Sequence, residues 1–412
     1  MKKRLFIILA VLLASSLILP GQASDFVLGI FGNANMDDAI DENDIDYLTG
    51  VIDGKNGQTK LSDANYDGKI DEADKLQIEK IILDKAQTLT IVDAVHRNIT
   101  LKVPARDVIC LNIQSAEAMR SLQAKDRIVG ITKYIQTDEF FPDFSNVDIV
   151  GGKAFQTPDF EQIIKIGPDV VFTAAWSGPQ LETINKLEPS GISVIHFDFL
   201  DPSTYIDEIT KLGYILGCRS RADDHISFYR GVMDMIAKRV DSIQDQNRPK
   251  VYYEANKYQA CAGGTPWSNQ IEIAGGNNIF GTDRGSYPHV DPEEVLIQDP
   301  DIIIQLNMSW TGYNRSDASE LEAIRDEILS RPELQQVSAI KNGRVYVIGG
   351  NYIPGSPRHF VSVAYMAKWF YRERFKDLNV TSIHQEYVTR FQELNFDLSK
   401  KGVFTYPPGE LN

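Results

Sequence analysis

Two stretches near the amino terminus carry oxygen-bearing side chains at the spacing of calcium-binding loops. They are residues 33–44 and residues 63–74. In the second loop, oxygen donors occupy positions 1, 3, 5, 9 and 12, and a glycine occupies position 6. Calcium prefers six to eight hard oxygen ligands, so this spacing predicts a calcium site. The candidate ligands are Asn33, Asn35, Asp37, Asp41 and Asp44 in the first loop and Asp63, Asn65, Asp67, Asp71 and Asp74 in the second.

The first loop departs from the usual pattern at two positions. Asn33 replaces the usual aspartate at position 1, and Asp38 takes position 6, where glycine is usual. The first loop therefore has one carboxylate fewer among its ligands and lacks the residue that favours a sharp turn. We expect it to bind calcium more weakly than the second loop.

Each loop leads into a predicted helix with an apolar stripe. The stripe residues are Leu48, Val51 and Ile52 after the first loop, and Ile78, Ile81 and Ile82 after the second. The tandem resembles a type I dockerin, whose duplicated loop–helix units bind calcium and dock onto a cohesin partner. The resemblance covers about residues 30–86 and implies a small all-α domain with a cohesin-like partner. The alternative is that calcium only stabilises the fold of a small cap.

Aromatic side chains follow several predicted buried strands. Trp176 comes shortly after a strand predicted at 170–172, and Trp310 comes shortly after one predicted at 302–304. Ligands of parallel sheets bind beyond the carboxyl ends of the strands, so these positions predict a binding cleft. Aromatic rings beside loop glycines suit a bulky planar or partly apolar ligand, although each ring alone is also compatible with a lid over the core. The candidates are Trp176, Tyr258, Trp267, Trp310, Tyr313 and Tyr352.

Arg358 is a further candidate for ligand binding. It follows Pro357 at the point where a helix is predicted to begin. A cation in the first turn of a helix opposes the helix dipole and needs compensation. An anionic ligand in the cleft would supply it, and a surface salt bridge is the alternative.

Two copies of one structural unit are expected to position these residues. Residues 160–172 and residues 292–304 each read as a short acidic-fronted helix, a Pro-Asp turn and a buried strand. Between them, residues 222–246 carry apolar side chains at three- and four-residue steps and contain no proline, which predicts one long helix. Strands and helices alternate on both sides of it, so we expect two related α/β halves with parallel sheets.

The order of several further sequence stretches indicates a family resemblance. Residues 115–122, 127–131, 150–152 and 341–346, together with both Pro-Asp strands, resemble the iron-complex and cobalamin class of periplasmic substrate-binding proteins. These are receptors that feed ABC importers. The match extends over about residues 88–375. It implies the class III periplasmic-binding-protein fold, in which two Rossmann-like lobes are joined by one long rigid helix and the ligand binds between them.

The resemblances imply a division of the chain and a docking surface. We expect a signal peptide (1–23), a dockerin-like domain (25–86), an N-terminal lobe (88–221), the interlobe helix (222–246), a C-terminal lobe (247–376) and a C-terminal extension (377–412). Glu161 and Glu293 occupy the same place in the two repeated units. In the resembled family, a glutamate at this position on each lobe pairs with arginines of a two-fold importer. The alternative is that the helix dipole alone favours an acid there.

Residues 1–23 have the form of a secretory signal. Lys2, Lys3 and Arg4 precede an apolar run that ends near Pro20. We therefore expect an exported protein at the cell surface or in the extracytoplasmic space, with an uncleaved leader as an alternative tether. Three cysteines, Cys110, Cys218 and Cys261, form an odd set, and the sequence leaves their pairing open.

Several functional classes are disfavoured. The formal net charge of −15 argues against a nucleic-acid partner. No phosphate-binding loop, His-Glu-x-x-His motif or nucleophile elbow is present, so we expect no enzyme. The six histidines are scattered, which disfavours direct capture of a bare transition metal.

These observations together predict a monomeric solute receptor of an ABC permease and ATPase. Its ligand is expected to be an iron complex, such as a ferric siderophore or haem, or a corrinoid. The alternative function is that of a dockerin-bearing adhesion or sensory component of the cell surface.

Overall fold

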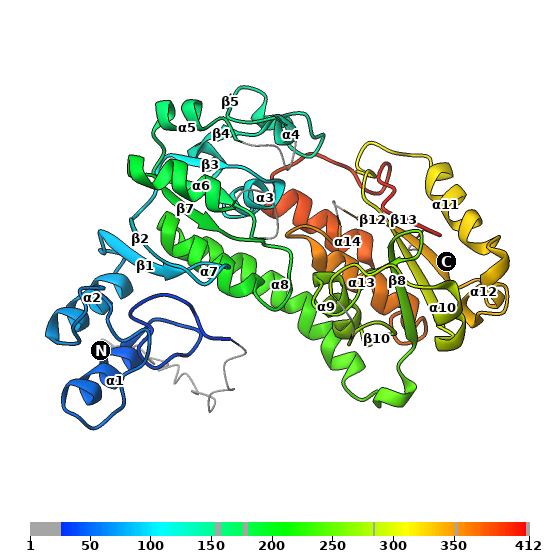
Figure 1. Ribbon diagram of the computed structural model, residues 1–412, viewed down its shortest axis with the longest axis horizontal. Coiled ribbons are helices and arrows are strands. Elements are labelled where there is room, and N and C mark those ends of the chain that lie inside the picture. Colours follow the sequence, from blue (N-terminus) through cyan, green and yellow to red (C-terminus); the bar gives the residue numbers. More distant parts are fainter. Residues whose placement is uncertain (1–25, 153–157, 176–179, 283–284, 351–352, 409–412) are drawn as a thin grey trace, which may run out of the picture.

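A computed structural model describes residues 26–152, 158–175, 180–282, 285–350 and 353–408. The chain forms two α/β lobes that one long helix connects, with a small helical unit at the side of the first lobe (Figure 1). The predicted signal peptide lies outside the described residues. Among those that are described, no helix has the length and apolar character needed to cross a bilayer.

The first lobe contains a parallel five-stranded sheet with the strand order β5-β4-β3-β6-β7. Its strands are β3 (Val108–Cys110), β4 (Ile128–Ile131), β5 (Asp148–Ile149), β6 (Val170–Thr173) and β7 (Ser193–His196). Its helices are α3 (Ile113–Ser121), α4 (Lys133–Gln136), α5 (Phe160–Ile166), α6 (Gln180–Leu187) and α7 (Tyr205–Leu216).

The second lobe repeats this plan around the sheet order β10-β8-β11-β12-β13. Its strands are β8 (Lys250–Asn256), β9 (Gln259–Ala260), β10 (Asn277–Asn278), β11 (Ile302–Asn307), β12 (Val345–Gly349) and β13 (Thr405–Tyr406). Strands β8, β10, β11 and β12 are parallel, whereas β13 runs antiparallel to β12. The helices are α9 (Pro266–Ile273), α10 (Pro292–Gln298), α11 (Ser319–Leu329), α12 (Ser338–Lys341) and α13 (His359–Phe370).

Both faces of each sheet are buried, which explains the continuous apolar strands. In the first lobe Ile109 and Val171 face one cluster, while their neighbours Val108 and Val170 face another. This alternation follows from the two-residue period of a strand. The second of these clusters extends through the connecting helix into the other lobe, so the inner faces of both sheets share one core.

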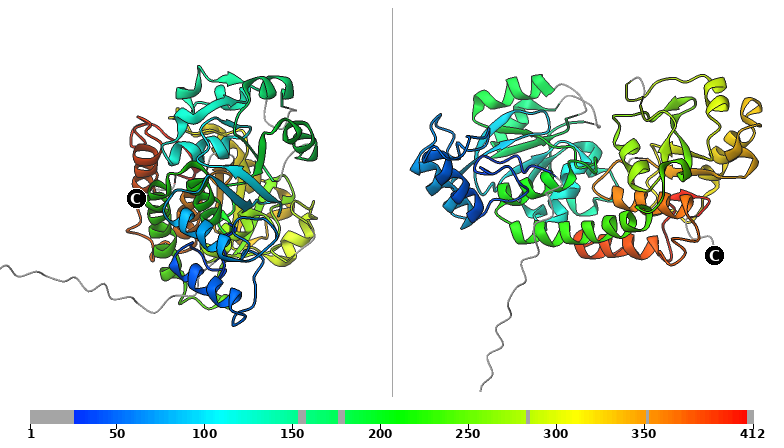
Figure 2. Two further views of the ribbon diagram at one scale, coloured as in Figure 1. Left: turned by 90° about the vertical axis from the view of Figure 1, so that its left-hand side faces the viewer. Right: turned by 90° about the horizontal axis from the view of Figure 1, so that it is seen from below.

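The connecting helix is α8 (Arg219–Val240), 22 residues or about 33 Å long. It begins three residues before the predicted start and ends six residues before the predicted end. Asp241 directly follows the last helical residue, and Ile243 in the following turn packs against the core. Seen from below, α8 runs along the base of both lobes, with the C-terminal helices beside it (Figure 2).

The two Pro-Asp units have the same structure. Helices α5 and α10 contain seven residues each and are followed by a left-handed residue, Gly167 (φ 66°) or Asp299 (φ 47°). The aspartate of each Pro-Asp turn then binds the start of the neighbouring strand. Asp169 accepts the backbone N–H of Asp107 at 3.1 Å, and Asp301 accepts that of Lys250 at 2.8 Å.

The N-terminal unit contains α1 (Glu42–Ile52) and α2 (Glu72–Ile82) and leads into a hairpin of β1 (Thr88–Val92) and β2 (Asn98–Lys102). It is not separated from the first lobe. Ile30 forms an isolated bridge with Ile91, and the buried residues of both helices belong to the core that also fills the first lobe. Arg219 of α8 donates to the backbone oxygen of Ile82 at 3.1 Å. The unit is therefore packed onto the receptor body.

The C-terminal segment is part of the body and not an appended extension. Helix α14 (Val380–Glu386) and a π-helical turn (Tyr387–Phe391) pack against both lobes. The Tyr387 hydroxyl donates to Glu117 of α3 at 2.6 Å, and β13 then joins the sheet of the second lobe. The segment therefore connects the lobes a second time, independently of α8.

A buried ion pair completes this connection. Glu117 of the first lobe binds Arg358, the residue before α13, at 2.6 Å, and neither side chain is exposed to solvent. Arg358 also donates to the Tyr313 hydroxyl. Breaking a buried pair on one side leaves a charge in an apolar surrounding, which is strongly destabilising.

We expect Glu117→Gln to lower the free energy of unfolding by roughly 3–5 kcal/mol, because Arg358 would stay buried without a counter-charge. Urea unfolding followed by circular dichroism measures this change. The control is Glu386→Gln, which removes a half-exposed partner of Arg390 and should cost less than about 1 kcal/mol. Equal losses in both variants would contradict the importance of the buried pair.

Candidate ligand-binding site

The floor of the interlobe region is built from two helix ends and one turn. Helices α3 and α9 follow the first strands of their lobes, and each begins at a side-chain cap, Asn112 or Thr265. The Gln114 amide donates to the backbone oxygen of Gly355 at 2.9 Å, and the Gln270 amide donates to that of Pro354 at 2.8 Å. Adjacent carbonyl groups are thus held from both lobes. We call these helix ends and residues 353–356 the interlobe floor.

The first lobe places three buried polar atoms without hydrogen-bond partners at or near this floor. They are Asn112 Nδ2, Thr132 Oγ1 and Glu139 Oε1. Asn112 and Thr132 follow the neighbouring strands β3 and β4, so both lie at the carboxyl edge of the sheet. The other carboxylate oxygen of Glu139 accepts from Asn314 of the second lobe at 3.0 Å. Glu139 is therefore also at the junction of the lobes.

The second lobe contributes two such atoms from α9. They are Trp267 Nε1 and Gln270 Oε1. Trp267 is 8% exposed, and its ring meets Tyr287 edge to face at 5.7 Å. Buried polar groups almost always have partners, so these five atoms near the junction are available to a ligand or to water. Together the five atoms comprise two N–H donors, one hydroxyl and two acceptors.

Arg358 does not present a free charge to a ligand. Its guanidinium is fully buried, pairs with Glu117 and stacks on the Phe140 ring at 3.6 Å from the ring centre. The prediction that Arg358 meets an anionic ligand is therefore corrected. The compensation that the helix start required comes from a carboxylate 241 residues away in the sequence.

Three predicted aromatic residues are also used inside the protein. Tyr313 is fully buried and hydrogen-bonds His384 at 2.7 Å. Trp310 is 3% exposed and packs with Leu321 and Val347 in the second lobe. Tyr258 stacks on the Arg331 guanidinium, at 4.9 Å from the ring centre, and donates its hydroxyl proton to Glu333. The structure thus corrects the prediction that Tyr313 and Trp310 line the cleft, because core packing satisfies them. Tyr258 is half-buried and its contact with Glu333 is exposed, so its place at the cleft stays a prediction.

Trp267 remains a predicted ligand contact, and Trp176 and Tyr352 lie outside the described residues. Sequence reasoning missed Thr132, Glu139 and Gln270 and did not select Asn112. The usable signal was that Asn112 and Thr132 directly follow strands of the first lobe. The positions of Glu139 and Gln270 depend on how the two lobes pack, which local patterns do not reveal.

The two oxygen-rich loops have closely similar frames. Asp44 accepts the N–H groups of Asn35 and Asp41, and Asp74 accepts those of Asn65 and Asp71, all at 2.9–3.1 Å. Position 12 of each loop is therefore a buried carboxylate that organises the backbone. Desolvation raises the pKa of Asp44 to about 6.

The loops differ where the sequence departs from the pattern. In the first loop the Asn35 side-chain amide donates a hydrogen bond to the Asp37 carboxylate at 2.7 Å, so one of the oxygens expected to bind calcium already has a partner within the loop. In the second loop Gly68 takes the left-handed turn (φ 87°), and the charges of Asp63 and Asp67 contribute to the raised pKa of Asp74, after desolvation.

No cluster of three or more histidine, cysteine or carboxylate side chains within the described ranges is arranged as a metal site. That finding includes the four carboxylates of the second loop, whose chemical type, together with the Asn65 amide oxygen, suits calcium.

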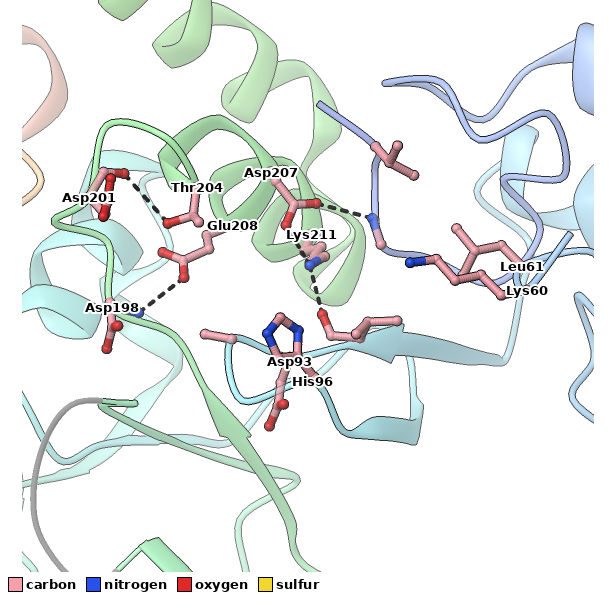
Figure 3. A pocket seen from close by; sticks show the side chains of 14 residues that line it. Lys60, Leu61, Asp93, His96, Asp198, Asp201, Thr204, Asp207, Glu208 and Lys211 are labelled. Atoms are coloured by element: carbon pink, nitrogen blue, oxygen red, sulfur yellow. Dashed lines mark hydrogen bonds and ion pairs between the residues drawn. The ribbon is translucent and has the colours of Figure 1, made fainter. Parts of the chain in front are cut away.

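A separate cavity of about 290 Å³ lies between the N-terminal unit, the hairpin and α7 (Figure 3). Its carboxylates already have partners. Asp207 pairs with Lys211 at 2.6 Å, and Glu208 accepts the backbone N–H of Phe199 at 2.6 Å. Burial raises the pKa of Glu208 to about 8. Pockets for small molecules measure about 300–1,000 Å³, so this cavity is too small for a bulky planar ligand.

The unpaired hydroxyl of Thr132 allows a direct test of the floor. Thr132→Val keeps the shape and removes a buried group without a partner, so we expect it to raise the free energy of unfolding by about 1 kcal/mol. The control is Thr90→Val, which breaks the 2.8 Å bond to Thr100 and should cost about 1 kcal/mol. Thermal and urea unfolding measure both. A loss of stability in Thr132→Val would show that its hydroxyl already has a partner.

The sequence profile of the family described as "Periplasmic binding protein" matches residues 108–352. A cobalamin-binding protein from Halobacterium salinarum is 27% identical over 289 residues, which cover 68% of this chain and 73% of the relative. A vitamin B12-binding protein from Yersinia pestis is 24% identical over 208 residues, which cover 48% of this chain and 69% of the relative.

Solved structures have the same fold. A TroA-like periplasmic binding protein from Veillonella parvula matches with a TM-score of 0.62 and 23% identity, covering 77% of this chain and 98% of the other. A periplasmic vitamin B12-binding protein from Vibrio cholerae matches with a TM-score of 0.53 and 19% identity, covering 66% of this chain and 99% of the other.

Proposed function

This chain belongs to the periplasmic binding protein family, and we propose that it is an extracytoplasmic receptor that binds a corrinoid between its lobes and delivers it to an ABC importer. The observation that carries the proposal is the set of unpartnered donors and acceptors at the interlobe floor. The cobalamin and vitamin B12 binders among the relatives support the same ligand class.

The chemistry of the floor favours a neutral ligand with amide groups. A corrinoid carries amide side chains around its ring, and each can donate and accept hydrogen bonds. The floor offers donors, Asn112 Nδ2 and Trp267 Nε1, and acceptors, Gln270 Oε1 and Glu139 Oε1. Haem and many ferric siderophores carry carboxylates or net negative charge, which favour a cation. Arg358 provides none, because Glu117 neutralises it.

Unpartnered polar groups can make the binding site selective. A site whose buried polar atoms are completed only by the right ligand rejects an analogue that lacks the matching groups, because those atoms would stay unpaired. The Trp267 ring adds apolar contact area to its N–H donor. The same residue thus provides both affinity and selectivity.

We expect Trp267→Phe to weaken the binding of cyanocobalamin by about 3- to 15-fold, because the ring is kept and one hydrogen bond is lost. Isothermal titration calorimetry measures the affinity, with haem and a ferric siderophore as competing candidates. Trp310→Phe is the matched control, since its indole donates to Val403 inside the second lobe, and its affinity should equal that of the wild type. Tighter binding of haem than of cyanocobalamin by the wild type would refute the corrinoid assignment.

Delivery requires contact with the importer. Glu161 and Glu293 are exposed on α5 and α10, and neither forms an ion pair within the described part of the chain. Their carboxylates are available to basic groups of a membrane partner. Exposed ion pairs contribute little affinity each, but a fixed pair of them sets orientation and the rate of encounter.

The N-terminal loops bind calcium in this proposal. The second loop has the more complete ligand set, Asp63, Asn65, Asp67, Asp71 and Asp74, and calcium would neutralise its mutually repelling carboxylates. Because the unit shares its core with the first lobe, calcium stabilises the receptor body. A cohesin-like partner stays a prediction from the resemblance; Leu76 and Leu83, exposed on or directly after α2, mark the face that it would use.

We expect Asp63→Asn to weaken the tighter of two calcium-binding events in calorimetry toward the affinity of the other, because it makes position 1 of the second loop like that of the first. The reciprocal change Asn33→Asp should strengthen the weaker event by adding a carboxylate. No calcium uptake by the wild-type protein, or a melting temperature that a chelator leaves unchanged, would refute the site.

The pKa of Asp44 predicts a pH dependence of the first loop. Calcium needs the ionised carboxylate, whereas burial raises the pKa of Asp44 to about 6. Protonation therefore competes with calcium below pH 6, and we expect the affinity of the weaker site to fall about tenfold per pH unit there. Above pH 7 this carboxylate is ionised and should impose no further change. Calcium titrations between pH 5 and 8 test this dependence.

A further inference from the structure

The two exposed glutamates stand beside exposed apolar residues at equivalent places. In α5, Glu161 is followed three residues later by Ile164, which is 43% exposed. In α10, Glu293 is followed three residues later by Leu296, which is 37% exposed. Residues three apart are neighbours on a helix surface. The residue before each exposed apolar side chain, Ile163 in α5 and Val295 in α10, is fully buried and fixes the orientation of its helix.

The helices differ at the next position. Lys165 follows Ile164 in the first lobe, whereas Ile297 follows Leu296 in the second. Ile297 is 80% exposed, more than any other large apolar side chain recorded as exposed in the described residues. We call Glu161, Ile164 and Lys165 the first-lobe patch, and Glu293, Leu296 and Ile297 the second-lobe patch.

We infer that the second-lobe patch carries most of the receptor's affinity for the membrane component of the importer, through its exposed apolar pair, and that the first-lobe patch adds little. This inference rests on the proposed delivery to an importer. The same acid and apolar neighbour recur once per lobe, so a partner with two like surfaces, each a basic group beside an apolar hollow, fits both. Adjacent exposed apolar residues at such a place mark an interaction surface.

The unequal strength follows from the exchange of a charged residue, Lys165, for an apolar one, Ile297, between the patches. A basic group that attracts Glu161 is also repelled by Lys165, whereas Ile297 adds apolar area next to Glu293. Burying apolar surface contributes about 25 cal/mol per Å². The second lobe therefore stays bound longer, and the first lobe is the one that releases first.

The experiment measures binding of the full-length receptor, with and without cyanocobalamin, to its importer in lipid nanodiscs by biolayer interferometry. We expect Leu296→Ser with Ile297→Ser to weaken binding at least about tenfold and Ile164→Ser by only about threefold. Lys165→Ile should tighten binding, because it gives the first lobe the second-lobe arrangement. Val27→Ser is the control, since Val27 is 40% exposed on the N-terminal unit, and it should leave importer binding unchanged.

Each outcome has a defined meaning. Equal losses from changes in the two lobes, or wild-type binding by the Leu296 and Ile297 double variant, would overturn the inference. If Glu161→Ala with Glu293→Ala still abolishes stimulation of the ATPase in that case, the proposed delivery stands without it. If the wild-type receptor neither binds the importer nor stimulates its ATPase, the proposed delivery itself fails. Circular dichroism and cyanocobalamin affinity confirm that each variant is folded.

Discussion

The arrangement of the two lobes depends on one buried ion pair. Glu117 and Arg358 are fully buried, come from different lobes and are surrounded by Tyr313, Tyr387 and the Phe140 ring. Such a pair does not contribute much net stability, but a mismatch would leave charge uncompensated in the core. It therefore restricts how the lobes meet. Helix α8 and the C-terminal segment add two covalent connections across the same junction, so a wide hinge motion would have to break buried contacts.

This rigidity explains how unpaired polar atoms persist at the interlobe floor. In the proposed site the many buried contacts of the junction offset their cost, and a ligand that bound there would recover it. Residues that serve a ligand are often less than optimal for stability. The ion pair and the floor therefore differ within the same junction. The charges of the ion pair have their partners, whereas several polar atoms of the floor have none.

The N-terminal unit and the lobes are also one structure. The core of the unit is continuous with that of the first lobe, and Arg219 and Arg230 of α8 reach its α2 carbonyl groups and Asp38. Asp38 stands where the second loop has Gly68, so the departure from the calcium pattern coincides with a contact to the receptor body. The separate docking domain expected from the sequence is thus part of the receptor body.

Local patterns in the sequence were sufficient to predict the main helices and strands. The periodicity of α8, the two Pro-Asp units and the alternation of strands and helices predicted two α/β lobes, because these features depend on neighbours within a few residues. The matched family supports that plan. The ends of α8 differed by several residues, since the apolar period continues to Ile243 although the helix ends at Val240.

The tertiary structure alone decided which side chains are free. Arg358, Trp310 and Tyr313 have the right types at the right strand ends, yet their partners come from 45 to 241 residues away and satisfy them within the core. Conversely, Glu139 and Gln270 carry no distinctive local signal. Whether a polar or aromatic group meets solvent, ligand or another part of the chain depends on long-range packing, which composition and spacing do not encode.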